Sequence, residues 1–246
     1  MKILVCISKA PDTTSKIAFT DSNTAFDTTG VQFIINPYDE WYALVRGLEL
    51  KEANGGSVTV LNVGGADNDP TIRKALAIGA DSAIRINMEP KDALGVAKQI
   101  SDYAKENGFD MILCGKETID YNGSQVGGMI AGYLDQPFIS NASKLDMDGN
   151  TATIERDIQG GKEVIQVDTP FVLSAAKGMS EPRIPNMRGI MAARSKALVV
   201  VEPGAFEDTT EIAEYILPAA KGACRMVSAD NPAELLDLLR NEAKII

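Results

Sequence analysis

The amino-acid sequence predicts an α/β protein with a doubly wound, mostly parallel sheet, helices on both faces, added β-hairpins and an extended C-terminal arm. The first observation is that short apolar stretches near residues 3, 58, 83 and 111 alternate with segments of helical periodicity. The second is that 45% of the residues are hydrophobic but only 6% are aromatic, which is typical of helices stacked on a parallel sheet. Repeated strand–helix–strand units with right-handed crossovers then produce the doubly wound arrangement.

The helices of the first half carry clear start signals. One begins at Asn36 and Pro37 and another at Asp69 and Pro70, where Asn or Asp can cap the helix and Pro suits its first turn. Glycines end these helices near residues 55 and 79. Residues 16–35 are predicted to form an irregular excursion or hairpin, and residues 91–107 a third helix. The four predicted strands are at 2–8, 57–63, 82–87 and 110–114.

The second half has a different pattern. Short runs of alternating polarity at 142–148, 151–157 and 162–167, separated by Gly-containing turns, predict hairpins. An apolar strand at 170–175 follows, and then a loop at 180–194 that passes into a short helix. After residue 201 the chain reads as an extended tail with a capped helix near its end, beginning at Asn231 and Pro232. We therefore divide the chain into a nucleotide-binding domain, 1–203, and an arm, 204–246. The pattern alone is equally compatible with an arm that packs on its own domain and one that wraps a partner.

Composition excludes several classes of function. A formal net charge of −10 disfavours nucleic-acid binding, which needs a basic surface. The chain has no histidine, so it cannot itself supply a Ser-His or Cys-His pair or a His-ligated metal. Its three cysteines, Cys6, Cys114 and Cys224, lack metal-ligand spacing. The apolar start is too short for a signal peptide, and no run approaches the ~20 residues of a membrane helix, so we expect a cytoplasmic protein without membrane insertion.

The segment 114–128 is the strongest candidate site. It follows a buried strand and opens an apolar helix, and helix amino termini at strand carboxyl ends attract phosphate. Asn122, Gly123 and Ser124 are small or cap-forming residues, and Gly127 leaves the first helical turn open. The segment is neither a Walker A loop nor a Gly-x-Gly-x-x-Gly fingerprint. On the residues alone, a nucleotide-binding loop and an ordinary capped loop remain equally good interpretations.

Five segments together resemble the electron-transfer flavoprotein beta (small) subunit family. They occur in the order of that family, and the resemblance spans about residues 1–203. They are Ile-Ser-Lys-Ala-Pro-Asp at 7–12, Asn-Pro at 36–37, the helix and turn at 71–81, Gly-Lys-Glu-Thr-Ile-Asp at 115–120, and the stretch from 155–163 through 181–187.

The resemblance implies a heterodimer with an alpha subunit that holds the redox FAD, while the beta subunit keeps AMP buried and does no bond chemistry itself. Electrons would pass from acyl-CoA or related dehydrogenases to a quinone reductase or another acceptor. The backbone amides of residues 124–127 would hold the phosphate, and Asp120 and Asn122 would shape the loop and touch the ribose. The implied cofactor-binding residues are Ala10, Asn36, Val63, Gly64, Asp120, Asn122, Gly123, Ser124, Gln125, Val126 and Gly127.

Two further residues carry partner roles by resemblance. Glu163, assigned to the turn Gly-Gly-Lys-Glu at 160–163, falls where the family places an acid near the flavin domain. Met187 falls near the apolar anchor of a dehydrogenase-recognition loop at 182–188, where a flexible thioether suits docking. The alternatives are a solvated acid for Glu163 and a buried side chain for Met187.

The sequence also departs from the family. Thr13 stands where some members carry a tyrosine near the flavin. The loop reads Asp-Tyr-Asn-Gly-Ser-Gln at 120–125, whereas members that bifurcate electrons more often show Asp-Thr-Ala-Gln. This difference favours AMP over a second FAD that oxidises NADH, which remains the alternative. A stand-alone adenine-nucleotide-binding protein of the universal-stress type is a further alternative, disfavoured by the hairpins and the tail.

Overall fold

The computed structural model describes residues 1–246 and confirms the predicted fold class. A nine-stranded sheet forms the centre, in the order β11-β10-β9-β12-β8-β1-β6-β7-β13. All neighbours from β9 to β13 in this order run parallel, and β10 and β11 add an antiparallel edge. The strands are β1 (Lys2–Cys6), β6 (Ser57–Val63), β7 (Ser82–Ile86), β8 (Met111–Gly115), β9 (Phe138–Asp148), β10 (Thr151–Ile158), β11 (Gly161–Asp168), β12 (Phe171–Ala175) and β13 (Leu198–Val201).

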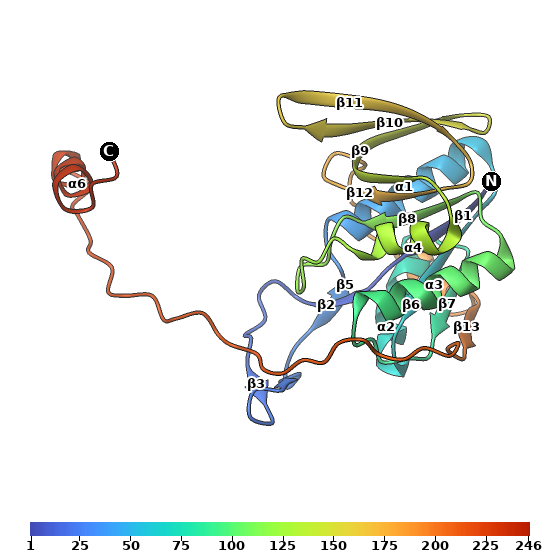
Figure 1. Cartoon of the computed structure of the whole chain (residues 1–246), viewed down its shortest axis with the longest axis horizontal. Coiled ribbons are helices and arrows are strands. Elements are labelled where there is room, and N and C mark those ends of the chain that lie inside the picture. The colour runs from blue at the N-terminus through green and yellow to red at the C-terminus, as the bar shows by residue number, and fades with distance from the viewer.

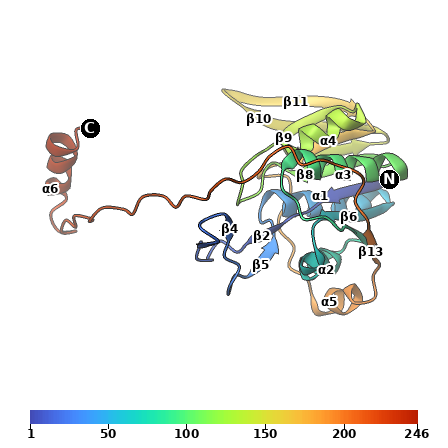
Figure 2. The same cartoon turned by 60° about the horizontal axis from the view of Figure 1, so that its bottom comes forward.

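Helices cover both faces of the sheet (Figure 1). Because side chains alternate along a strand, Ile3 and Val5 of β1 belong to one apolar core and Leu4 and Cys6 to the other. The first core includes α1 (Asp39–Asn54) and α2 (Asp69–Ile78), and α5 (Met187–Ala193) packs on α2 (Figure 2). The second core includes α3 (Ala93–Asn107) and α4 (Val126–Leu134). None of the helices is both long and apolar enough to cross a membrane.

The first helix begins later than predicted, so the assignment of Asn36 as its cap was wrong. Helix α1 starts at Asp39 after Tyr38, which has a φ of 66° and makes no side-chain cap bond. The Asn36 side chain is instead fully buried: Nδ2 donates to the Glu117 carbonyl at 3.0 Å, and Oδ1 accepts from Ile119 N–H at 2.9 Å. Asn36 thus fixes the loop after β8 instead of the helix.

The hairpins continue the main sheet. Strand β9 begins at Phe138, four residues earlier than predicted, and this added part pairs parallel with β12. Turns with positive φ at Gly149 and Gly160 connect β9, β10 and β11, as the sequence predicts. The excursion near the N-terminus contains two small sheets, β2 (Lys9–Pro11) with β5 (Phe33–Ile35) and β3 (Phe19–Thr20) with β4 (Ala25–Phe26).

The C-terminal arm first lies along α3 and then leaves the body (Figure 1). Gln99 and Gly204 exchange two hydrogen bonds of 2.8 and 2.9 Å. Asp92 accepts from Thr209 N at 3.1 Å and Thr209 Oγ1 at 2.8 Å. Tyr215 stacks on Phe19 with ring centroids 4.8 Å apart. Beyond it the chain is extended and ends in α6 (Pro232–Asp237) and one π-helical turn (Leu238–Glu242).

Asp92→Ala is expected to loosen the first part of the arm. Asp92 Oδ1 caps α3 by accepting from Gly95 N at 2.6 Å, so the free energy of unfolding should fall by about 1 kcal/mol. Amide hydrogen exchange at 204–215 should rise. Asp92→Asn is the matched control, since its amide oxygen can keep the cap while its NH₂ group cannot accept from Thr209. Equal exchange in all three proteins would show that the arm is held elsewhere.

Candidate nucleotide site

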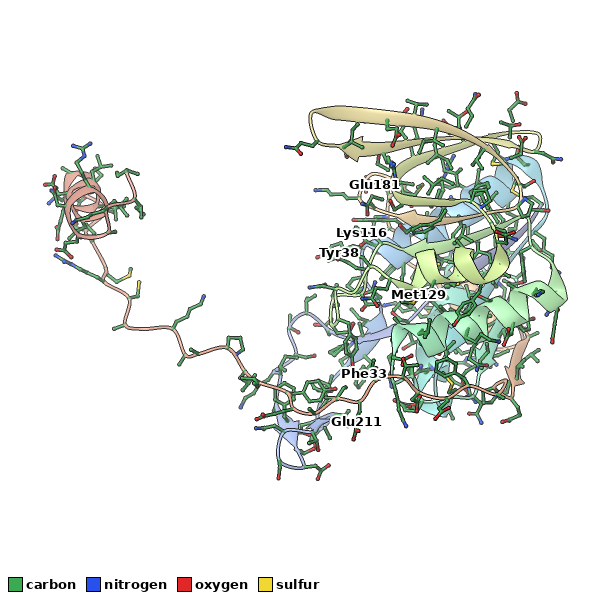
Figure 3. The ribbon with its side chains drawn as sticks, viewed as in Figure 1. Phe33, Tyr38, Lys116, Met129, Glu181 and Glu211 are labelled. Atoms are coloured by element: carbon green, nitrogen blue, oxygen red, sulfur yellow. The ribbon has the colours of Figure 1, made fainter.

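The candidate site lies where the strand order reverses. From β1 the chain winds through β6 to β7 on one side, whereas β8 pairs with β1 on the other. In open parallel sheets this switch point forms a crevice at the strand carboxyl ends. The segments that follow β1, β6 and β8 meet at this edge, so the topology brings together the predicted residues at 10, 63–64 and 120–127. Tyr38 and Lys116 lie next to each other there (Figure 3).

The loop between β8 and α4 has an internal polar framework. Lys116 Nζ pairs with Glu117 Oε1 at 2.9 Å, and the Ser124 hydroxyl donates to Glu117 Oε2 at 3.2 Å. Asn122 N donates to the Thr118 carbonyl at 2.9 Å. Asn122 and Ser124 have φ values of 49° and 51°, a left-handed conformation that is uncommon for Ser. The loop is therefore built as a specific turn that leads into α4.

The start of α4 has no side-chain cap. Gln125 is the residue before the helix, and its side chain accepts no backbone hydrogen bond. The first N–H groups of α4, at Val126 and Gly127, therefore lack a capping side chain, and a helix start of this kind favours an anion. Gly127 also lets α4 approach β9, because a Cβ there would lie 2.9 Å from Phe138 Cε2.

The surface next to this loop is hollowed. A cavity of about 230 Å³ lies there, and two lysines and two tyrosines are among the residues that line it. Of the residues predicted to bind the cofactor, Asn122 lines this cavity as well. Ala10 and Asn36 have no exposed surface, and Val63 is 8% exposed, so these three lie beneath the crevice surface. The cavity is lined by Pro37, Tyr38, Asp39, Tyr42, Lys116, Glu117, Ile119, Asn122 and Lys177.

A chain of buried polar groups supports the ends of β1, β6 and β7, and sequence reasoning missed it. Asn62 Nδ2 donates to the Ile7 carbonyl at 2.9 Å, and Asn68 Nδ2 donates to Asn62 Oδ1 at 2.8 Å. The Arg85 guanidinium binds the Gly64 carbonyl at 3.1 Å, and Arg85 is 5% exposed. A side chain at Gly64 would overlap the Asn68 amide. These contacts explain the need for glycine at 64 and fix the turn after β6.

Glu40 is the other residue that the sequence analysis missed. It lies in the first turn of α1, is 7% exposed, and accepts from Ser8 N at 2.6 Å and Ser8 Oγ at 2.8 Å. Burial raises the pKa of this carboxyl to about 8, although the Ser8 hydrogen bonds oppose the shift. One sequence signal could have identified it: Glu40 shares a helical face with Leu44 and Leu48, four and eight residues on.

Met187 is exposed at the start of α5. Its exposed fraction is 74%, which excludes a buried role, and Ile184, Ile190 and Met191 are exposed beside it in the sequence. The helix itself is firmly placed. Its cap Asn186 accepts from Gly189 N at 2.8 Å. Arg73 from α2 donates to the carbonyl of Ala193, the last residue of α5, at 2.8 Å and to that of Lys196, three residues further on, at 2.7 Å.

Glu163 lies on strand β11, in agreement with the predicted run at 162–167, so its assignment to the turn at 160–163 was wrong. The turn consists of Gln159 and Gly160, and Glu163 stands opposite Arg156 in the β10–β11 pair. Its Oε2 accepts from Arg156 Nε at 2.5 Å. The acid is thus half of a partly buried ion pair. No group of three or more acidic, His or Cys side chains in the chain is placed to hold a metal ion.

The fold is that of a doubly wound α/β protein with a crevice at the switch point of its sheet. Comparison with known proteins identifies the family. Residues 23–205 match the electron transfer flavoprotein domain. The chain is 36% identical to electron transfer flavoprotein subunit beta of Bacillus subtilis (strain 168) over 260 residues, covering 100% of both chains. It is 33% identical to the subunit beta of Syntrophomonas wolfei, covering 100% and 98%, and 34% identical to that of Homo sapiens, covering 83% and 82%. The chain therefore belongs to the electron transfer flavoprotein beta subunit family, whose members are electron-carrier subunits.

Proposed function

We propose that this chain is the small subunit of a heterodimeric electron-transfer flavoprotein that holds AMP in the crevice between β1 and β8. Its partner would be an alpha subunit that carries FAD, the group that accepts and releases the electrons. Electrons would pass from acyl-CoA or related dehydrogenases through that FAD to an acceptor such as a quinone reductase. The observation that carries this proposal is the uncapped start of α4 at the switch point of the sheet.

The donors at the crevice fit a nucleotide monophosphate. The backbone amides of residues 124–127 would bind the phosphate, with the Ser124 hydroxyl beside them, now turned to Glu117. Asp120 and Asn122 would face the ribose, and the turn at Val63 and Gly64 would border the adenine. Ala10 and Asn36 are fully buried, so they would support the site through the segments that they hold.

The exposed apolar side chains of α5 are the proposed dehydrogenase-docking surface. Met187, Ile190 and Met191 present apolar atoms on a helix that α2 holds in place, and Ile184 is exposed in the loop just before that helix. Apolar anchors on a rigid support are typical of binding hot spots. The Glu163 ion pair would instead steer the mobile flavin domain of the alpha subunit.

We further propose that the arm, 204–246, wraps the alpha subunit. After Tyr215 it makes no packing contact that buries its apolar residues: Ile216 is 79% exposed and Met226 is 84% exposed. The terminal helix α6 also has no buried residue. Apolar side chains in this number on an extended segment favour a partner surface over solvent.

The nucleotide content of the complex tests the proposal. After co-expression with the alpha subunit and acid extraction, we expect one AMP and one FAD per heterodimer. Two FAD and no AMP would identify an electron-bifurcating complex with NADH oxidation at the second FAD. A complex that contains FAD but no second nucleotide would overturn the proposed site. The separately purified alpha subunit is the control that assigns each nucleotide to its subunit.

A further inference from the structure

The carboxyl group of Glu40 lies between the ends of the two strands that flank the crevice. It accepts two hydrogen bonds from Ser8, which lies two residues after the end of β1. On the other side it packs on the end of β8, where a Cβ at Gly115 would lie 2.7 Å from Glu40 Cγ and 2.8 Å from Glu40 N. The close approach of α1 to β8 therefore depends on glycine at 115 and places Glu40 at the switch point.

The surroundings of Glu40 contain no compensating positive charge. None of the ion pairs of the structure includes Glu40, and its hydrogen-bond donors are the two groups of Ser8. The ionisable groups that face it are Asp39 on its own helix, Asp120 on the loop after β8, and the Cys6 thiol on β1, beside that of Cys114 on β8. Burial together with these two aspartates raises the pKa of Glu40 to about 8.

We propose that Glu40 is a positioning residue of the nucleotide site, whose neutral carboxyl holds residues 8–10 against the crevice and whose ionisation weakens nucleotide binding. The inference rests on the proposed function of the crevice. A neutral carboxyl can accept from Ser8 N and share a hydrogen bond with Ser8 Oγ. The ionised group places an unpaired negative charge below a site for a phosphate, where the low dielectric strengthens repulsion.

Equilibrium binding of AMP to the heterodimer across pH tests this role. The AMP phosphate itself is already about nine-tenths doubly ionised at pH 7, because the second pKa of such a group is about 6, so its own titration contributes little above pH 7. Between pH 7 and pH 9 we expect AMP affinity of the unmodified complex to fall about tenfold, as one proton is lost from a group with a pKa of about 8.

Glu40→Gln is the decisive variant, because its amide preserves both contacts to Ser8 and cannot ionise. We expect it to bind AMP at pH 7 as the unmodified complex does and to keep that affinity at pH 9. Glu40→Ala should bind weakly at both pH values. Glu49→Gln makes the same chemical change at a position of α1 that is not buried. It should show the same dependence of AMP affinity on pH as the unmodified complex.

Stability provides a second readout. The folded state keeps the Glu40 proton up to about pH 8, whereas the same carboxyl in the unfolded chain loses it near its ordinary pKa of 4.5. The folded protein therefore binds more protons in this window, and its stability should fall as the pH rises from about 4.5 to 8. Glu40→Gln should remove that part of the decline in thermal unfolding.

The outcomes separate the two proposals. If the unmodified complex binds no AMP at any pH, the proposed nucleotide function is wrong. If it binds AMP but Glu40→Gln shows the same pH profile and the same stability decline, the function stands and the role of Glu40 is overturned.

Discussion

A Gly127→Leu variant is expected to lose most of its bound nucleotide and to unfold about 1–3 kcal/mol more easily. The sequence predicts a glycine here because a side chain would block the phosphate. The structure adds a second reason: a Cβ at 127 would lie 2.9 Å from Cε2 and 3.3 Å from Cζ of Phe138. Since the ring belongs to β9, the first turn of α4 would have to move, and its free N–H groups would move with it.

Two controls isolate this cause. Gly132→Leu changes the same helix at a position where a Cβ meets nothing within 4 Å, so it should keep both nucleotide and stability. Adding Phe138→Ala to Gly127→Leu should restore part of both, because it removes the atoms that clash. Nucleotide per heterodimer after gel filtration and urea unfolding are the measurements. Stoichiometric nucleotide in Gly127→Leu would mean that the site lies elsewhere.

The sheet could be predicted because each of its inner strands is a short apolar run bounded by turns. β1, β6, β7 and β8 all lie within two residues of the predicted ends. Strand β13 (Leu198–Val201) was missed, although Leu-Val-Val-Val is itself a short apolar run rich in β-branched residues. Its pairing with β7 is a tertiary contact that the run does not specify. The parallel pairing of β9 with β12 was missed for the same reason, because it is a tertiary contact that the polarity pattern of neither segment indicates.

The site could be predicted only to the level of its loops. Glycines and cap-forming residues between 115 and 128 marked the segment before α4. The supporting side chains, Glu40, Asn62, Asn68 and Arg85, are polar and buried, and a polar residue in a sequence is normally assigned to the surface. The contacts that tie them to other strands and loops span 21 to 55 residues, as for Arg85 with Gly64 and Asn62 with Ile7, so a local pattern cannot identify these contacts.

Met187→Glu should impair electron uptake from the dehydrogenase while leaving the flavin and the nucleotide bound. An exposed apolar anchor is worth about 2 kcal/mol in an interface, which corresponds to a roughly 30-fold higher KM for the dehydrogenase. The fold should be unaffected, because Met187 is 74% exposed and the position of α5 depends on Asn186, Gly189 and Arg73 instead.

A graded series at this position distinguishes docking from an indirect effect. Met187→Leu keeps an apolar side chain of similar volume and should behave like the unmodified complex, whereas Met187→Gln should fall between Leu and Glu. Gly189→Val acts differently: its side chain would overlap the Ala77 carbonyl oxygen on α2, so it should displace the whole of α5 and also lower stability. Steady-state reduction by a dehydrogenase, with flavin content measured in parallel, gives the comparison. Unchanged electron-transfer rates in Met187→Glu would exclude α5 as the docking surface, because a buried carboxylate without a partner could not be accommodated there without a loss of affinity.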